Sequence, residues 1–100
     1  MEIEFENKDL MRLYESGHGS ANYPAQVVSA FFRRMATITG AADERDFYAL
    51  KGLHFEKIKE PDGCHSMRLN KGWRLILELD KSVRGRTVVR LREINRHYGD

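Results

Sequence analysis

The sequence contains a single cysteine, Cys64, and only two prolines in 100 residues. One cysteine cannot form a disulfide within the chain, so nothing suggests a secreted, disulfide-stabilised fold. No apolar run approaches the roughly 18–20 residues that a helix needs to span a bilayer. The acidic, alternating start, MEIEFE, does not resemble a signal peptide. We therefore expect a cytoplasmic protein with no membrane partner.

Repeats, low-complexity tracts and linkers are also missing, so the length predicts one domain, residues 1–100, with one modest core. The net charge of +2 conceals an asymmetry. Residues 1–50 carry 5 Lys/Arg and 8 Asp/Glu, whereas residues 51–100 carry 12 and 7. The second half is thus where a polyanion would bind, although a well-solvated sheet face would have the same composition.

The first half of the chain predicts a short strand followed by helices. Ile3 and Phe5 alternate with glutamates, which is typical of a strand. Apolar residues then recur at three- and four-residue spacing, first after Asn7, a good helix N-cap, and again from Pro24, which is tolerated in a first helical turn. The first expected helix begins at Lys8 and is ended by Gly17 and Gly19. The second begins near Pro24 with Gly40 as its C-terminal cap, and a short third helix covers residues 43–50 and is closed by Gly52.

In the second half the hydrophobic period changes to two, which predicts a meander of strands. The expected strands cover residues 54–58, 64–70, 73–80 and 87–95, with turns at Pro61-Asp62-Gly63 and Asn70-Lys71-Gly72. The fold class is therefore α+β. We expect an N-terminal strand and two to three helices packed on one face of a largely antiparallel, four- to five-stranded sheet.

Arginine is unusually frequent on one face of this predicted sheet. The helices would cover the leucine-rich face, and the opposite face would present Arg68, Arg74, Arg90 and Arg92. The terminal Arg96-His97-Tyr98 would lie just beyond the edge of that face. Alternation alone predicts a polar face, but this composition indicates phosphate binding next to groups that can transfer protons.

The segment from Leu53 to Leu79, LHFEKIKEPDGCHSMRLNKGWRLILEL, resembles the core of RelE/HigB-type toxins of bacterial type II toxin–antitoxin pairs. There, a lysine-containing strand leads to a glycine turn, a Ser-x-Arg strand and an aromatic residue followed by arginine, here Gly63, Ser66 to Arg68, and Trp73-Arg74. The resemblance implies a RelE-like fold and a toxin that cuts messenger RNA on translating ribosomes. It also implies attack by the RNA's own 2′-hydroxyl, without metal or cofactor, and a cognate antitoxin, expected to be a small helix-turn-helix protein.

By this resemblance, Arg74 corresponds to the arginine that stabilises the transition state, and His54 to a histidine of HigB-like members. The chain ends differently from HigB-like toxins, which commonly finish Asp-Tyr-His. His97 and Tyr98 are closer to the His-Tyr ending of YoeB-like toxins and are the candidate proton-transfer groups. The resemblance makes Arg68 a supporting cation and either Lys57 or Lys59 the strand lysine. The expected phosphate-binding residues are Lys57, Lys59, Arg68, Arg90, Arg92 and Arg96.

Several alternatives remain open from the sequence. Glu56 or Glu60 could serve as a carboxylate base, and Tyr98 could stack on a nucleobase instead of donating a proton. The histidines and Cys64 lack the spacing of a metal site. The rival functions are a ParE-like toxin that binds DNA gyrase, and an RNA- or protein-binding module without chemistry.

Overall fold

The computed structural model describes residues 1–82 and 84–96. The candidate residues His97 and Tyr98 therefore lie outside the described part of the chain. Five strands form one sheet in the order β1-β5-β4-β3-β2. Only β1 and β5 pair in parallel, whereas the other neighbours are antiparallel. The strands are β1 (Glu2–Phe5), β2 (Glu56–Lys57), β3 (Cys64–Asn70), β4 (Trp73–Asp80) and β5 (Val88–Arg96).

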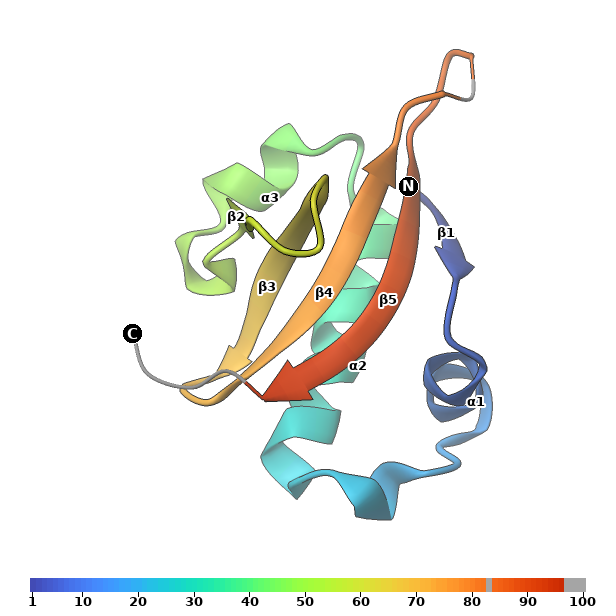
Figure 1. Cartoon of the computed structure of the whole chain (residues 1–100), viewed down its shortest axis with the longest axis vertical. Coiled ribbons are helices and arrows are strands. Elements are labelled where there is room, and N and C mark those ends of the chain that lie inside the picture. The colour runs from blue at the N-terminus through green and yellow to red at the C-terminus, as the bar shows by residue number, and fades with distance from the viewer. Residues whose placement is uncertain (83, 97–100) are drawn as a thin grey trace.

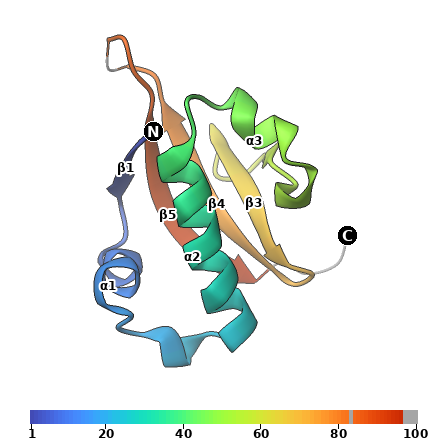
Figure 2. The same cartoon turned by 180° about the vertical axis from the view of Figure 1, so that it is seen from behind.

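The helices lie on one side of this sheet. The long helix α2 crosses behind the strands in Figure 1 and in front of them in Figure 2. The helices are α1 (Lys8–Ser16), α2 (Ala25–Gly40) and α3 (Arg45–Ala49), with the 3-10 turns η1 (Ser20–Asn22) and η2 (Lys51–Leu53). The expected α+β class, with helices on one face of a largely antiparallel sheet, is confirmed. We call the face away from the helices the open face.

Local chemistry explains where α1 begins and ends. The Asn7 side chain accepts hydrogen bonds from the backbone N–H groups of Asp9 and Leu10, at 2.9 and 3.2 Å. These bonds satisfy two donors that a helix start leaves unpaired. Gly17 ends the helix with φ 74°, a left-handed conformation that glycine adopts without steric cost. Both signals were visible in the sequence.

The other helix boundaries correct the expected ones. Pro24 is the N-cap of α2 rather than part of its first turn. Gly40 is the last helical residue, and the chain leaves α2 through Ala41 in an extended conformation, so no left-handed glycine is needed. Helix α3 ends at Ala49, and Gly52 lies within the 3-10 turn that follows.

The expected strand 54–58 is reduced to the two residues of β2. His54 adopts φ 46° and ψ 48° as the C-cap of η2. A non-glycine residue with positive φ cannot continue into an extended strand, so the backbone turns at His54 before Phe55 enters the core. His54 therefore stands at a corner beside β3 rather than within the sheet.

The core lies between the helices and the sheet, as the alternation predicted. In α2, the side chains of Val27, Phe31, Met35 and Ile38 are fully buried. The sheet contributes the expected apolar residues, Met67, Leu69, Leu75, Leu77 and Leu91, each at most 5% exposed. Burial of such side chains is the main favourable term in folding.

A β-bulge in β5 changes the alternation near the end of the chain. Leu77 pairs with Leu91 but Ile76 pairs with Glu93, so Arg92 is the additional residue. A bulge shifts all later side chains to the other face. Consequently Ile94, three residues after Leu91, also enters the core. On the open face, Ile76, Cys64 and Ser66 are also buried.

His65 belongs to the helix-covered side, where it has a structural role. Its ring stacks on Phe55, with centroids 4.8 Å apart and planes within 4°. Its Nδ1 atom is buried without a hydrogen-bond partner in the described residues. Burial lowers the pKa of His65, and the nearby Glu44 opposes this effect while Lys57 and Lys81 add to it. The folded protein thus favours the neutral ring.

Folding stability should therefore fall in mild acid. The unfolded histidine takes up a proton at about pH 6.5 and the folded one at lower pH. The contribution of His65 is present above about pH 6.5 and is lost as the pH falls below it. Urea midpoints measured on both sides of that value should separate for the wild type but separate less for His65→Phe, which keeps the stacked ring. An equal separation in both proteins would contradict this role of His65.

Candidate nucleic-acid interface

Two arginines face each other on the open face. The β3–β4 register places Arg68 directly opposite Arg74. Like charges in directly opposite positions of an antiparallel pair destabilise a sheet. Within residues 1–82 and 84–96, no carboxylate forms an ion pair with either guanidinium. Their charges are therefore available to an anion such as a phosphate.

Hydrogen bonds to neighbouring side chains orient both arginines. Nη1 of Arg68 donates to Nε2 of His54 at 3.2 Å. Because a guanidinium can only donate, this contact requires Nε2 to be the unprotonated ring nitrogen. On the other side, Nε of Arg74 donates to Oδ1 of Asn95 at 3.3 Å. Asn95 is paired with Arg74 across β4 and β5, so both arginines and His54 form one short row.

A third arginine supports this row from the helix side. Nε of Arg34, in α2, donates to the main-chain oxygen of Arg68 at 2.9 Å. The register of β3 shifts between Arg68 and Asn70, where β3 turns toward β4. Arg34 therefore fixes the irregular end of the strand that presents Arg68. Burial, and then the neighbouring Arg33, lower the pKa of Arg34.

The end of β5 reaches the same end of the sheet. Arg96 pairs with Trp73, and its guanidinium carbon lies 5.9 Å from the centre of the Trp73 ring. Such a distance suits a cation–π contact. Trp73 in turn packs edge-on against Tyr23, with ring centroids 5.8 Å apart. The described chain thus ends next to the strand position that carries Arg74.

The arginines of β5 have a different environment. Arg90 lies near four carboxylates, with closest distances of 2.8 Å to Asp80, 3.2 Å to Glu78, 3.6 Å to Glu4 and 3.9 Å to Glu6. Arg92 pairs with Glu6 at 3.2 Å and with Glu78 at 3.6 Å. The expected face of four arginines is therefore divided: within the described residues Arg68 and Arg74 form no ion pair, whereas Arg90 and Arg92 are ion-paired.

The candidate lysines do not join the Arg68–Arg74 row. The β2–β3 register places Glu56 opposite Ser66 and Lys57 opposite His65. Since opposite residues share a face, Lys57 lies on the helix side and Glu56 on the open side. Lys59 and Glu60 are exposed in the segment after β2. Of the candidate carboxylate bases, Glu56 is thus the one that shares the face of Arg68.

Four contributors to this surface were not recognised as such in the sequence: Arg34, Asn95, Glu4 and Glu6. Arg34 and Asn95 act through tertiary contacts that no local pattern shows. Glu4 and Glu6 were recognised only as the polar side of a strand. The useful signal was the acidic alternation of residues 2–6, which complements the basic alternation of β5 once the two strands are neighbours.

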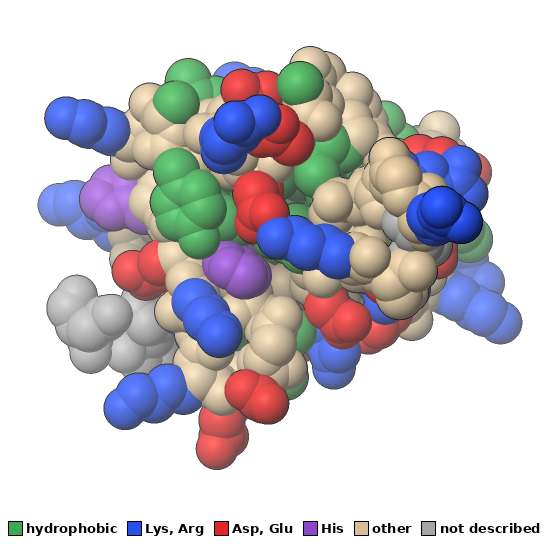
Figure 3. Space-filling view, turned by 90° about the horizontal axis from the view of Figure 1, so that it is seen from above, with side chains coloured by type: hydrophobic (Ala, Val, Ile, Leu, Met, Phe, Trp, Pro, Cys, Tyr) green, Lys and Arg blue, Asp and Glu red, His purple; other side chains and the backbone are tan. Residues whose placement is uncertain are grey.

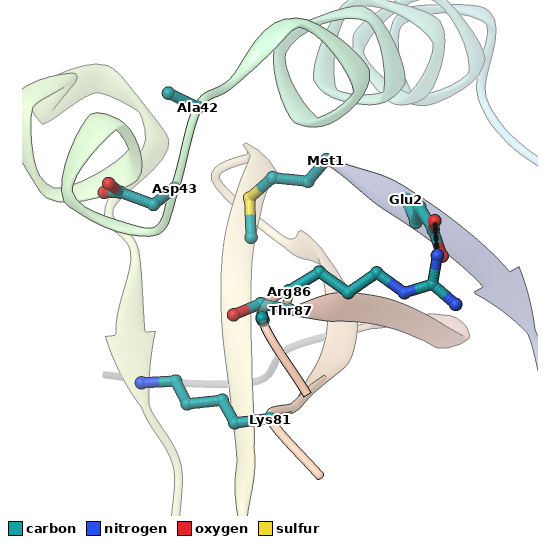
Figure 4. A pocket seen from close by; sticks show the side chains of 8 residues that line it. Met1, Glu2, Ala42, Asp43, Lys81, Arg86 and Thr87 are labelled. Carbon is teal, nitrogen blue, oxygen red and sulfur yellow. Dashed lines mark hydrogen bonds and ion pairs between the residues drawn. The ribbon is translucent and has the colours of Figure 1, made fainter. Parts of the chain in front are cut away.

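A separate hollow lies near the β4–β5 loop. It has a volume of about 480 Å³ and is lined by Met1, Glu2, Ala42, Asp43, Lys81, Gly85, Arg86 and Thr87. Figure 4 shows Arg86 joined to Glu2 at its side, an ion pair of 2.7 Å. Viewed from above in Figure 3, basic and acidic side chains are interspersed over this end of the molecule. The hollow shares no residue with the Arg68–Arg74 row.

The described residues, 1–82 and 84–96, were also compared with the requirements of a metal site and of a membrane-spanning helix. No group of three or more His, Cys, Asp or Glu side chains gathers there in a way that could hold a metal ion. None of the helices in these ranges is long and apolar enough to cross a membrane.

Comparison with known proteins identifies the family. A model of the RelE-like toxin of type II toxin–antitoxin system HigB matches residues 3–89. The chain belongs to the HigB-like toxin family. It is 32% identical over 79 residues to Toxin HigB-1 of Vibrio cholerae serotype O1, a match covering 78% of this chain and 83% of that protein. The expected membership among RelE/HigB-type toxins is confirmed.

Solved structures show the same fold. YafQ from E. coli strain BL21(DE3) superimposes with a TM-score of 0.57 at 11% identity, covering 95% of this chain and 91% of that one. The YoeB/ParE toxin from Agrobacterium tumefaciens also gives 0.57, at 13% identity, covering 98% and 100%. The RelE-like architecture is thus confirmed. As a HigB-like toxin of a type II system, the protein has a cognate antitoxin as its implied partner.

Proposed function

We propose that this HigB-like toxin is a ribosome-dependent messenger endonuclease that inhibits translation. The observation that carries the proposal is the pair Arg68 and Arg74, which lie opposite each other without a carboxylate partner among the described residues. A phosphodiester placed above them would relieve the repulsion between the two charges. RNA cleavage needs arginines that can bind phosphate. A sheet face with a purely structural role would be destabilised by two arginines opposite each other without a carboxylate partner.

The chemistry follows from the positions of these groups. The 2′-hydroxyl of the RNA would attack the adjacent phosphorus while the 5′-oxygen of the next nucleotide leaves. Arg74 would stabilise the negative charge that develops on the phosphoryl oxygens, with Arg68 as the second cation. The 2′-hydroxyl proton requires a base and the leaving oxygen an acid. His54, next to Arg68, and the terminal His97 and Tyr98 remain the proposed proton-transfer groups, with Glu56 as an alternative base.

Affinity for the ribosome would come mainly from phosphate contacts, which carry little sequence information. Arg68 and Arg74 form the proposed contact on the open face. Arg96 lies at the same end of the sheet but opposite Trp73, on the helix side, and could extend the contact at the edge. Lys59 is exposed and could extend it, whereas Lys57 lies on the opposite face of β2. The proposed partners are therefore the ribosome and its messenger, besides the antitoxin.

The direct test is single-turnover cleavage of messenger bound to purified ribosomes, combined with expression of the toxin without its antitoxin. We expect messenger cleavage on ribosomes and growth arrest accompanied by loss of protein synthesis. Arrest with intact messenger and damaged DNA would favour the gyrase-directed alternative. Ribosome binding without any cleavage would favour a binding module that lacks chemistry.

A further inference from the structure

The first and last strands bring opposite charges together. The parallel register of β1 and β5 places Glu4 directly opposite Arg90 and Glu2 opposite Val88. The same alternation carries Glu6 to Arg92, which it contacts at 3.2 Å. Glu78 and Asp80 of β4 approach Arg90 from the other side, at 3.2 and 2.8 Å. The two arginines are therefore enclosed between acidic strands.

The balance of this cluster is negative. Two guanidinium groups, Arg90 and Arg92, contact four carboxylates, those of Glu4, Glu6, Glu78 and Asp80. Only 23% of the Arg90 side chain is exposed. An incoming phosphate would thus meet carboxylates around each arginine and would have to displace them.

Asp80 and Arg90 keep their charges across the pH range of a cell. Hydrogen bonds from Ser82, and then from Arg90, lower the pKa of Asp80 to about 2. The hydrogen bond to Asp80 is likewise the main reason why the pKa of Arg90 is raised. The Asp80 carboxylate also accepts from the backbone N–H of Ser82 at 2.9 Å, so its position is fixed by the loop as well as by Arg90.

We propose that Glu4 and Glu6 are specificity-determining residues that, together with Glu78 and Asp80, withhold Arg90 and Arg92 from RNA phosphates. This acidic screen confines phosphate binding to the Arg68–Arg74 end of the open face. The inference rests on the proposed function, because it concerns which RNA the same surface accepts. A toxin with four free arginines would hold any single-stranded RNA. The screened toxin binds free RNA weakly and depends on the ribosome to present its substrate.

The experiment measures binding of a short, unstructured single-stranded RNA at several salt concentrations. Each phosphate contact adds about 0.7 to the slope of log affinity against log salt for single strands. The variant Glu4→Gln with Glu6→Gln should raise the slope by about 0.7, because Arg92 loses its nearest carboxylate while Arg90 keeps Asp80 and Glu78. An unchanged slope would overturn the screen. Both glutamates are substantially exposed, so the isosteric change preserves the strand.

Three matched variants make the result specific. Glu15→Gln with Asp62→Asn changes the net charge equally, at exposed residues that form no ion pair within the described chain, and should leave the slope nearly unchanged. Arg92→Gln in the wild-type background should also leave it unchanged, whereas a fall would show that Arg92 already binds RNA and would overturn the proposal. Adding Arg92→Gln to the double glutamine variant should reverse the rise, because Arg92 is the arginine that the variant makes available.

Failure of the screen and failure of the proposed function can be told apart. The salt titration uses free RNA and does not require cleavage. If the wild type cuts ribosome-bound messenger but the slopes do not change, the screen alone is wrong. If the slopes change as expected but ribosomes show no cleavage, the screen stands as a property of RNA binding and the proposed nuclease activity is wrong.

Discussion

Replacing Arg74 by alanine should slow single-turnover cleavage of ribosome-bound messenger by about 10²–10³-fold, the usual effect of removing one donor that stabilises a developing oxyanion. The reason is its position: Arg74 faces Arg68 on the open face and is oriented by Asn95. An interaction made mainly in the transition state lowers the chemical rate more than it lowers affinity. Ribosome binding should therefore weaken far less than the cleavage rate.

Two control variants test whether the loss of cleavage rate is specific to Arg74. Arg12→Ala removes an exposed arginine of α1, on the helix side, whose partner is Asp9 at 3.5 Å, and should cleave at the wild-type rate. Arg74→Lys keeps the charge but loses the fork of donors, so an intermediate rate is expected. If Arg74→Ala cuts as fast as the wild type, or if its whole defect disappears at saturating ribosome concentration, Arg74 does not act on the reacting phosphate.

The sequence predicted the parts of the fold that depend on local chemistry. Helix α1 begins after Asn7 and ends at Gly17 as expected, because capping involves residues next to each other in the chain. The strand ranges of β3 and β4 were also predicted, because alternation over seven or eight residues is a strong signal. The helix-covered face of the sheet followed from the same alternation.

Features that depend on distant neighbours were not predicted. The parallel pairing of β1 with β5 joins the two ends of the described chain, and only this pairing reveals that Glu4 and Glu6 surround Arg90 and Arg92. The alternation of β3, β4 and β5 suggested one face with four equivalent arginines, Arg68, Arg74, Arg90 and Arg92. The structure separates them, because their partners come from β1 and from the end of β4.

The candidate site was likewise predicted only in outline. Arg68 and Arg74 were expected on one face, and they lie opposite each other. His54 was assigned to a strand, yet its left-handed backbone is what brings Nε2 to within 3.2 Å of Arg68. The spacing Leu91 to Ile94 is a sign of the β5 bulge, but the sequence alone does not distinguish a bulge from the end of a strand.

The terminal pair His97 and Tyr98 gives the second large prediction. Both lie outside the described residues, but β5 brings the chain as far as Arg96, which pairs with Trp73, next to Arg74 on β4. Histidine is the side chain whose ordinary pKa lies closest to cellular pH, and general acid–base help is worth about 10²–10⁴-fold. His97→Ala and Tyr98→Phe should each reduce single-turnover cleavage within that range while ribosome affinity stays nearly constant.

The comparison between tyrosine variants separates two roles. A loss with Tyr98→Phe means that the hydroxyl group donates a proton or a hydrogen bond. A loss with Tyr98→Ala but none with Tyr98→Phe means that the ring stacks on a base, which is worth about 1–3 kcal/mol and should appear in affinity as well. If His97→Ala and Tyr98→Ala both cut at the wild-type rate, the proton transfers belong to His54 or Glu56. His54→Ala and Glu56→Gln would then be the variants that lose the cleavage rate, because these two residues share the surface of Arg68.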